Sequence, residues 1–390
     1  MSQMDFPEPD APVESTDPEA LKAAIDAGED VTILDTRAQS NYESWAIDGE
    51  NVTDANVPYF EFLEGVTDDL LERVPDDDDL LVVCAKGESS AYVAGLLNEE
   101  GYDATNLADG MQGWARVYEH TDIDLDSGAT VRQYRRPSSG CLGYMVYDGD
   151  EAAVVDPLRA FTDRYVDDAA ELGVTITAVL DTHVHADHIS GVRQLADAAD
   201  ADLLLPAHAV ERGLDYDDDY ETLSDGDTVA VGAATIEAVY TPGHTSGMTS
   251  YLVDGDLVLT GDTLFVDSVA RPDLEDGDEG APDAAAQLYE TLQERLLTLP
   301  DDTLVAAAHF GGCSEPRDDG AYVAPIGDVE DEVSLLANDR DEFVDEVLAD
   351  MPPRPSNYED IIATNLGRQS ADDEEAFELE LGPNNCAASE

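Results

Sequence analysis

Basic residues are scarce in this sequence, where 18 Lys and Arg stand against 90 Asp and Glu and the formal net charge is -72. Nucleic acids and anionic membrane surfaces would repel so acidic a chain, so we exclude both as partners. Like charges at this density destabilise a fold unless salt screens them, and the Debye length falls to about 3 Å at 1 M salt. The charge therefore indicates a halophilic protein, adapted to the cytoplasm of a salt-accumulating organism.

Cysteines and long apolar runs are also few. The four cysteines are too scattered for a disulfide scaffold and favour reduced thiols in a cytosol; they are Cys84, Cys141, Cys313 and Cys386. No segment reaches the roughly 20 apolar residues of a membrane span, and the N-terminus has neither the basic nor the apolar region of a secretory signal. We expect a soluble cytoplasmic protein, and a homodimer is left open.

The length of 390 residues exceeds the size at which one hydrophobic core usually stops growing, which predicts two domains. Residues 15–120 alternate helix-like and strand-like segments, which is typical of a parallel sheet covered by helices. The polar, turn-rich stretch 121–130 is expected to be a linker. A second domain is expected over 131–367, beginning with a hairpin that turns at Asp-Gly, and residues 368–390 are expected to form a frayed acidic tail.

A first candidate site lies in "VVCAKGESSAYVA", where Cys84 ends a buried strand and precedes a glycine-containing loop and a helix. Backbone N–H groups of such a loop, together with a helix N-terminus, stabilise an anion. They would therefore favour a thiolate or a persulfide at Cys84. The alternative is a small cysteine that only fills the core.

This stretch resembles the active loop of the rhodanese family, C-x-x-G-x-x-S, and the likeness extends to "LDTR" and "NLADGMQGW", over roughly residues 15–118. The resemblance implies that Cys84 carries sulfane sulfur as a persulfide. Many members that use thiosulfate have an arginine just before the final serine, whereas this chain has Ser89 there. Lys86 is then the cation left in the loop and the candidate substrate-binding residue, which argues against thiosulfate as the donor.

A second candidate site begins in "THVHADHISG", where a buried strand ends at a turn. Extended geometry sends His183 and His185 to the same side, and the turn that follows adds Asp187 and His188. Further candidates lie where other apolar strands end; they are His244, Asp262 and His309. Imidazole and carboxylate groups gathered at strand ends predict a site for first-row metals. Two histidines lack such a setting: His120 and His208.

The pattern H-x-H-x-D-H followed by separate His, Asp and His is similar to that of the metallo-β-lactamase fold, over about residues 131–367. This resemblance implies an αββα sandwich. Within the fold, "THVHADHISG", "TPGHTSG", "GDTLFVDSVARPDL" and "EFVDEVLADMPPRPSNYEDIIATNLG" are most similar to the persulfide dioxygenase branch. That branch implies an enzyme that oxidises a low-molecular-weight thiol persulfide with O2, giving sulfite and thiol.

Carried onto this sequence, the branch's mononuclear Fe(II), one per chain, would lie on His183, His244 and Asp262. Two imidazoles and one carboxylate on one face leave coordination positions open for substrate and oxygen. The resemblance implies an outer shell that orients ligands, whereas binuclear zinc relatives use the same residues as ligands; the set is His185, Asp187, His188 and His309. Arg271 would bind the anionic persulfide, the alternative being a surface ion pair.

Two other functions fit parts of the pattern. A glyoxalase II-like thioester hydrolase would hold two zinc ions on all seven residues and attack with a metal-bound hydroxide. Zinc has no redox chemistry of its own, so oxygen use separates this hydrolase from the dioxygenase. A sulfur carrier or sensor without catalysis would predict an incomplete ligand set, and the ligand set here is complete.

Overall fold

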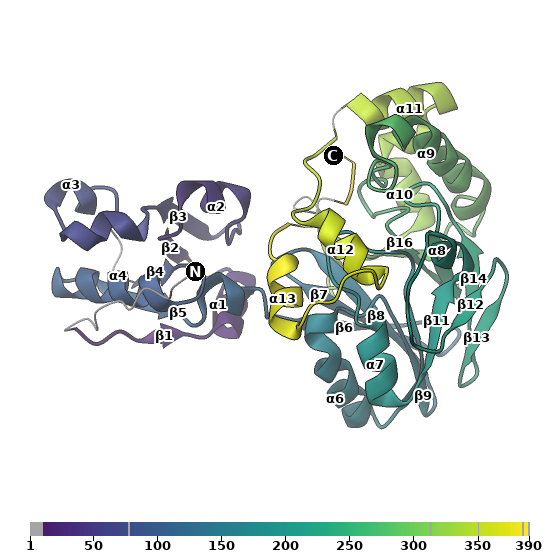
Figure 1. Cartoon of the computed structure of the whole chain (residues 1–390), viewed down its shortest axis with the longest axis horizontal. Helices are drawn as coiled ribbons and strands as arrows, with labels where there is room; N and C mark the ends of the chain where they lie inside the picture. Colours follow the sequence, from purple (N-terminus) through teal and green to yellow (C-terminus); the bar gives the residue numbers. More distant parts are fainter. Residues whose placement is uncertain (1–10, 77–78, 312–313, 350, 384–385, 389–390) are drawn as a thin grey trace. The chain divides into compact units, whose positions relative to one another are not determined.

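Figure 1 shows the computed structural model of the chain, which describes residues 11–76, 79–311, 314–349, 351–383 and 386–388. The chain forms two compact units. One is made of Met1–Val117 with Arg136–Ser138, and the other of Tyr118–Arg135 with Ser139–Glu390. No helix in the described part of the chain is long and apolar enough to cross a bilayer.

The first unit is built on a five-stranded sheet in the order β1-β5-β4-β2-β3, in which every pairing is parallel. Its strands are β1 (Ser15–Thr16), β2 (Val31–Asp35), β3 (Val52–Asn56), β4 (Asp79–Val83) and β5 (Asp103–Leu107). Its helices are α1 (Pro18–Asp26), α2 (Gln39–Ser44), η1 (Tyr59–Glu64), α3 (Asp68–Leu71), α4 (Glu88–Glu99) and α5 (Gly110–Trp114). The alternation of helix and strand in the sequence predicts this parallel sheet, and the structure confirms it.

Helices cover both faces of this sheet because β2 and β4 are apolar at successive positions. Leu34 and Val82 join one core cluster with the side chains of α4 and η1. Their neighbours Ile33 and Val83 point to the opposite face and pack against α1 and α5. Side chains of a strand alternate between faces, so a continuous apolar run is what a sheet buried on both sides requires.

The second unit contains two sheets. One has seven strands in the order β12-β11-β10-β9-β8-β7-β6: β6 (Glu119–Asp124), β7 (Thr130–Arg136), β8 (Cys141–Asp148), β9 (Glu151–Val155), β10 (Thr175–Leu180), β11 (Asp202–Pro206) and β12 (Glu221–Leu223). The other has six in the order β13-β14-β15-β16-β17-β18: β13 (Thr228–Val231), β14 (Ala234–Tyr240), β15 (Thr249–Val253), β16 (Leu257–Gly261), β17 (Leu304–Ala307) and β18 (Ala324–Pro325).

The inner faces of the two sheets share one apolar core, in which residues such as Val155 and Leu180 meet Tyr251 and Leu257. Helices cover both outer faces (Figure 1). On the seven-stranded sheet lie α6 (Thr162–Leu172) and α7 (Val192–Ala199), and on the six-stranded sheet lie α9 (Gly277–Thr291), α10 (Ile326–Glu332) and α11 (Arg340–Ala349). This order of layers is the αββα sandwich expected from the sequence.

Residues 121–130, expected to be a linker, lie instead in β6 and in the turn of an antiparallel β6–β7 hairpin. The stretch reads as polar because aspartates alternate with buried Ile123 and Leu125. Such alternation is typical of an edge strand with one face on the core, and a count of polar residues overlooks it.

The region 368–390, expected to be a frayed tail, contains an ordered helix in its described part. Helix α13 (Asp373–Leu379) starts at a capping box in which Asp372 and Glu375 satisfy each other's backbone N–H groups. Ala376 and Phe377 are buried, as is Cys386 beyond the helix. The high density of acidic residues led to the prediction of a frayed tail. Acidic side chains in the first turn nevertheless stabilise a helix, because they interact favourably with its N-terminus.

Candidate functional site

Three strand ends of the second unit bring the predicted metal-binding residues together. The loop of His183 follows β10, Asp262 follows β16 directly, and His309 stands two residues beyond β17. His244 lies in the loop between β14 and β15. The loop after β10 continues to Gly191, and α7 begins at Val192.

His183, His244 and Asp262 form a buried cluster. His183 Nε2 lies 3.7 Å and His244 Nε2 lies 3.5 Å from Asp262 Oδ2. In the part of the chain that the structure describes, none of these three atoms has a hydrogen-bond partner. Leaving a buried polar atom unpaired costs about 1–3 kcal/mol, so three that converge call for an explanation. A cation between them would satisfy all three, and the donor set therefore fits a metal ion.

The second ring nitrogen of each of the two histidines is held by a hydrogen bond. His183 Nδ1 donates to Thr182 Oγ1 at 2.9 Å, and that hydroxyl donates to Asp156 Oδ2 at 2.9 Å. His244 Nδ1 donates to the Arg271 carbonyl oxygen at 2.8 Å. Each anchoring bond places the proton on Nδ1 and leaves the lone pair of Nε2 facing the cluster, which is how proteins orient histidine ligands.

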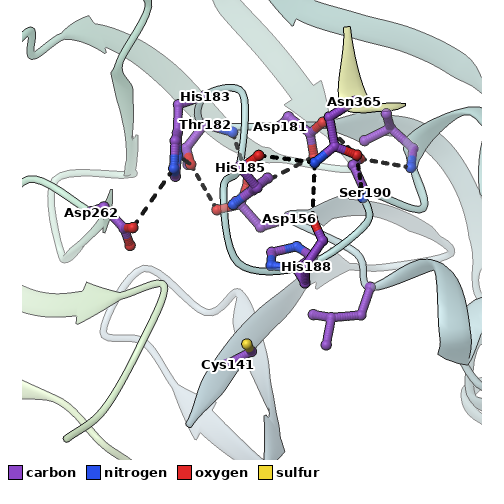
Figure 2. Close-up of polar contacts among 12 residues, drawn as sticks. Cys141, Asp156, Asp181, Thr182, His183, His185, His188, Ser190, Asp262 and Asn365 are labelled. Carbon is purple, nitrogen blue, oxygen red and sulfur yellow. Dashed lines mark hydrogen bonds and ion pairs between the residues drawn. The ribbon is translucent and has the colours of Figure 1, made fainter. Parts of the chain in front are cut away.

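His185 turns away from this cluster (Figure 2). Its Nε2 lies 3.0 Å from Asp156 Oδ1 and 3.7 Å from Asp181 Oδ1. Burial alone would lower the pKa of His185, but the Asp156 and Asp181 carboxylates raise it well above its usual value. Asp156 is a site residue that the sequence interpretation missed, because a single Asp after a strand carries no distinguishing spacing.

A second buried cluster surrounds Asp187. Its Oδ2 accepts from His309 Nε2 at 2.7 Å, from His188 Nδ1 at 3.0 Å and from Cys141 Sγ at 3.1 Å. His309 Nδ1 lies 2.7 Å from Asp262 Oδ1, so this ring links the two clusters. Burial opposes charge on His309, yet Asp262 and Asp187 raise the pKa of this imidazole well above its usual value. Cys141, at the start of apolar β8, was not predicted to be here.

The C-terminal helices fix the histidine loop. In α12 (Tyr358–Asn365), the Asn365 amide donates to the carbonyl oxygens of His185 at 3.0 Å and His188 at 2.8 Å, and it accepts from Ser190 N at 2.9 Å. Glu380, just past α13, accepts from Ile189 N at 3.0 Å. Sequence spacing gave no signal for either residue, because both are more than 170 positions from the loop.

Arg271, predicted to bind the substrate, is 1% exposed and engaged within the fold. Its guanidinium donates to both oxygens of Asp273 and to the carbonyl oxygens of Pro352 and Pro353. Its backbone carbonyl anchors His244. These contacts support a role in holding the metal cluster, and they give no support to direct binding of an anion.

In the first unit, Cys84 lies in the loop between β4 and α4. Its Sγ accepts from Gly87 N at 3.1 Å and lies 3.0 Å from Ser90 Oγ, whose one hydrogen is shared between this sulfur and Asn106 Oδ1 at 2.6 Å. Gly87 has φ +82 and turns the loop into the first turn of α4. Two donors aimed at one sulfur, at the start of a helix, are what an anionic sulfur would need. Lys86 is exposed in the same loop.

The fold and the sites define a two-part protein of known families. The rhodanese-like domain family matches residues 17–117, and the metallo-beta-lactamase superfamily matches residues 138–309. Among curated relatives, persulfide dioxygenase ETHE1 of Bos taurus is 31% identical over 201 residues, which cover 50% of this chain and 72% of that protein. The chain therefore belongs to the metallo-beta-lactamase superfamily and carries an N-terminal rhodanese-like domain.

Two further proteins are similar to this chain, one a dioxygenase homologue and one a hydrolase. A solved structure of ETHE1 from Myxococcus xanthus matches 61% of this chain and 99% of that one, with a TM-score of 0.52 and 30% identity. A hydroxyacylglutathione hydrolase of Synechococcus is 35% identical over 170 residues, which cover 41% of this chain and 59% of that protein. ETHE1 proteins are thus homologues of this chain, and so is a hydrolase of the same superfamily.

Proposed function

We propose that the second unit is a persulfide dioxygenase, in which His183, His244 and Asp262 hold one Fe(II). Its substrates would be a low-molecular-weight thiol persulfide, O2 and water, and its products the thiol and sulfite. The convergence of three unpaired ligand atoms from two imidazoles and one carboxylate carries this proposal. The likeness to proteins named persulfide dioxygenase supports the choice of substrate.

Each nearby residue has a part in this reaction. When bound, Fe(II) on one carboxylate and two imidazoles supplies redox chemistry and open positions for sulfur and oxygen. Asp262 contributes the negative charge, and its Oδ1 contact with His309 keeps Oδ2 turned toward the two histidines. Thr182 and the Arg271 carbonyl fix the orientation of the two imidazoles. The cluster is fully buried, which keeps water from forming hydrogen bonds with the ligand atoms.

One observation favours one metal over two. His185, a ligand in binuclear zinc relatives, is bound to Asp156 and lies outside the cluster of His183, His244 and Asp262. In the cluster around Asp187, the Oδ2 atom accepts three hydrogen bonds, whereas Asp187 Oδ1 and His188 Nε2 have no partner among the described residues and could hold a second metal. The rival is a thioester hydrolase with two zinc ions, which the likeness to hydroxyacylglutathione hydrolase favours.

We also propose that Cys84 of the rhodanese-like domain carries sulfane sulfur as a persulfide and exchanges it with thiols. The Gly87 N–H and the Ser90 hydroxyl would stabilise the anionic sulfur. Lys86, exposed in the loop, would attract an anionic sulfur donor. Cys84→Ser should abolish sulfur transfer while leaving persulfide oxidation unchanged, whereas loss of both activities would contradict separate sites.

The test is made on protein purified without oxygen. We expect close to one iron per chain, uptake of O2 when a thiol persulfide is added, and sulfite as a product. Asp262→Ala should lose both iron and activity, because it removes the one carboxylate of the three ligands. Asp197→Ala, which changes an exposed residue of α7, is the matched control and should keep both.

The same preparation decides between the two candidate functions. Two zinc ions per chain, hydrolysis of a thioester and no oxygen uptake would assign the protein to the hydrolases. Iron that stays bound in Asp262→Ala would show that the ligand set is wrong.

A further inference from the structure

Three buried tyrosines lie together beside the metal-ligand clusters, and the proposed function does not use them. They are Tyr118 in the chain before β6, Tyr134 in β7 and Tyr165 in α6, all in one core cluster. Tyr118 Oη and Tyr165 Oη are 2.6 Å apart. The Tyr134 ring stacks on Tyr118 with centroids 5.5 Å apart and meets Tyr165 edge-on at 4.8 Å. Their rings are therefore in continuous contact.

Cys141 connects this group to the metal-ligand clusters. Its thiol donates to Asp187 Oδ2, which His309 joins to Asp262. Cys141 also belongs to the apolar core cluster that contains the three tyrosines. Gly143, two residues along β8, faces both phenols: a Cβ there would lie 3.0 Å from Tyr165 Oη and 3.2 Å from Tyr118 Oη. Burial raises the pKa of both phenols, and the nearby Cys141 thiol adds to the rise.

The other end of the group reaches the surface. The His120 ring centre is 6.0 Å from that of Tyr134, and the His120 side chain is 32% exposed. Tyr134 Oη is buried beside Asp168, whose Oδ2 lies 3.5 Å from Arg132 Nη1 and 3.9 Å from His120 Nδ1. Burial first, and then the Asp168 charge, raise the pKa of Tyr134. The phenol thus stands next to a carboxylate that can take its proton.

Tyrosine differs from phenylalanine in two respects that matter in a core: it donates hydrogen bonds, and it is readily oxidised by one electron. The Tyr134 hydroxyl faces the Asp168 carboxylate, which also pairs with Arg132 and Arg164. A phenol held next to a carboxylate is suited to one-electron oxidation, because its proton can leave when the electron leaves.

We propose that Cys141, Tyr165, Tyr118 and Tyr134 form an electron-transfer path that carries oxidising equivalents from the metal site to the surface. The proposal rests on iron at the site of the proposed function, but not on which sulfur compound is oxidised there. An oxygen-using site with such a path would be protected from oxidation of its own ligands.

The oxidant is a hydroxyl radical, which forms together with hydroxide when Fe(II) gives one electron to hydrogen peroxide, and a thiol in solution would reduce the resulting Fe(III) again. The radical takes a hydrogen atom from Cys141, giving water and a thiyl radical. An electron then passes from Tyr134 through Tyr118 and Tyr165 to that sulfur, which regains a proton from its hydrogen-bonded surroundings, while the Tyr134 phenol releases its proton to Asp168. A thiol in solution returns a hydrogen atom to Tyr134, and two of the thiyl radicals so formed combine as a disulfide.

The experiment uses the full chain loaded with Fe(II), with no persulfide present. Hydrogen peroxide is added, samples are frozen within milliseconds, and electron paramagnetic resonance detects radicals. We expect a tyrosyl signal in the unaltered protein and its loss in Tyr134→Phe, with several-fold more sulfinic and sulfonic acid at Cys141 by mass spectrometry. Tyr289→Phe is the matched control, because Tyr289 packs against Phe343 on the other sheet and should change neither readout.

Several results would overturn the path. These are a tyrosyl signal that survives in Tyr134→Phe, no signal in the unaltered iron-loaded protein, or equal oxidation of Cys141 in both. Tyr165→Phe, which should trap the oxidation at Cys141 in the same way, covers the case in which Tyr134→Phe does not fold. Oxygen uptake with persulfide is measured separately, so an iron protein with the radical but without uptake would contradict the proposed function and leave the path standing.

Discussion

Both carboxylate oxygens of Asp156 bind the loop that carries His183 and His185. Its Oδ1 accepts from Thr182 N at 2.6 Å and faces His185 Nε2, while its Oδ2 accepts from Thr182 Oγ1. The residue itself has φ +51, a left-handed conformation in which Asp and Asn are tolerated better than other side chains with a Cβ. One carboxylate thus fixes the Thr182 hydroxyl that orients His183 and removes His185 from the ligand cluster.

Replacing this carboxylate by its amide should weaken metal binding without disturbing the backbone. Asp156→Asn keeps the shape and the left-handed φ, but its Nδ2 cannot accept a hydrogen bond. We expect about 10- to 100-fold weaker iron binding, measured by competition with a chelator, as is typical when a ligand's supporting partner is lost.

Asp167→Asn, on the exposed side of α6, makes the same chemical change away from the site and should leave the affinity unchanged. Unchanged affinity in Asp156→Asn as well would show that Asp156 does not orient the ligands.

The short helix α5 holds the loop of Cys84 in place. Although α5 follows β5 in the chain, its first N–H groups reach that loop: Met111 N donates to the Cys84 carbonyl oxygen at 2.8 Å and Gln112 N to that of Ala85 at 3.1 Å. The approach is close because position 110 is glycine, with φ +56. A Cβ at Gly110 would stand 2.1 Å from the Cys84 carbonyl oxygen, closer than any real contact.

This close approach can be tested with two glycine variants of the first unit. Gly110→Ala has both a positive φ and the clash with Cys84, so it should lose most sulfur transfer and destabilise the unit beyond the cost of φ alone. Gly101→Ala also has a positive φ, +101, but nothing lies within 4 Å of its Cβ.

Gly101→Ala should therefore show only the strain of about 1–2 kcal/mol expected for a left-handed L-residue. Sulfur transfer and thermal unfolding report the two effects. Equal losses in both variants would contradict a specific role for the α5 contact.

The whole molecule combines buried ligand sites with a surface that is acidic nearly throughout. With 18 basic residues against 90 acidic ones, few carboxylates can find an ion-pair partner. The energetic consequence is self-repulsion, which grows as the Debye length lengthens from about 3 Å at 1 M salt to about 10 Å at 0.1 M. The adaptation to a salt-accumulating cytoplasm stays a prediction from this charge.

We therefore expect the fold to be lost as potassium chloride is lowered from molar concentrations to about 0.1 M, where screening weakens. Circular dichroism in the far ultraviolet measures this loss. Sucrose at equal osmolarity is the control, because it stabilises burial without screening charge. A spectrum unchanged at low salt, or full protection by sucrose, would show that charge repulsion does not limit stability.

Much of the molecule could be predicted from local sequence. Apolar runs gave the buried strands, and Cys84 and the histidine motif could be placed at strand ends because the chemistry of a loop follows from the elements beside it. The limits of these predictions lay in residues 121–130 and 368–390, where acidic side chains outweighed the apolar positions that form β6 and α13. Strong surface charge thus masks periodicity in a protein of this composition.

What the sequence by itself determined is the set of chemical groups and the strand ends that carry them: the thiol at 84, and the imidazoles and carboxylates from 183 to 309. Only the tertiary structure decided which of them share a cluster. It paired His185 with Asp156, brought Cys141 to Asp187, placed Asn365 on the histidine loop and used the Arg271 guanidinium inside the fold. Apart from the local Arg271–Asp273 pair, these contacts join residues from 29 to 180 positions apart, and such pairings depend on how sheets and helices pack, which no local pattern encodes.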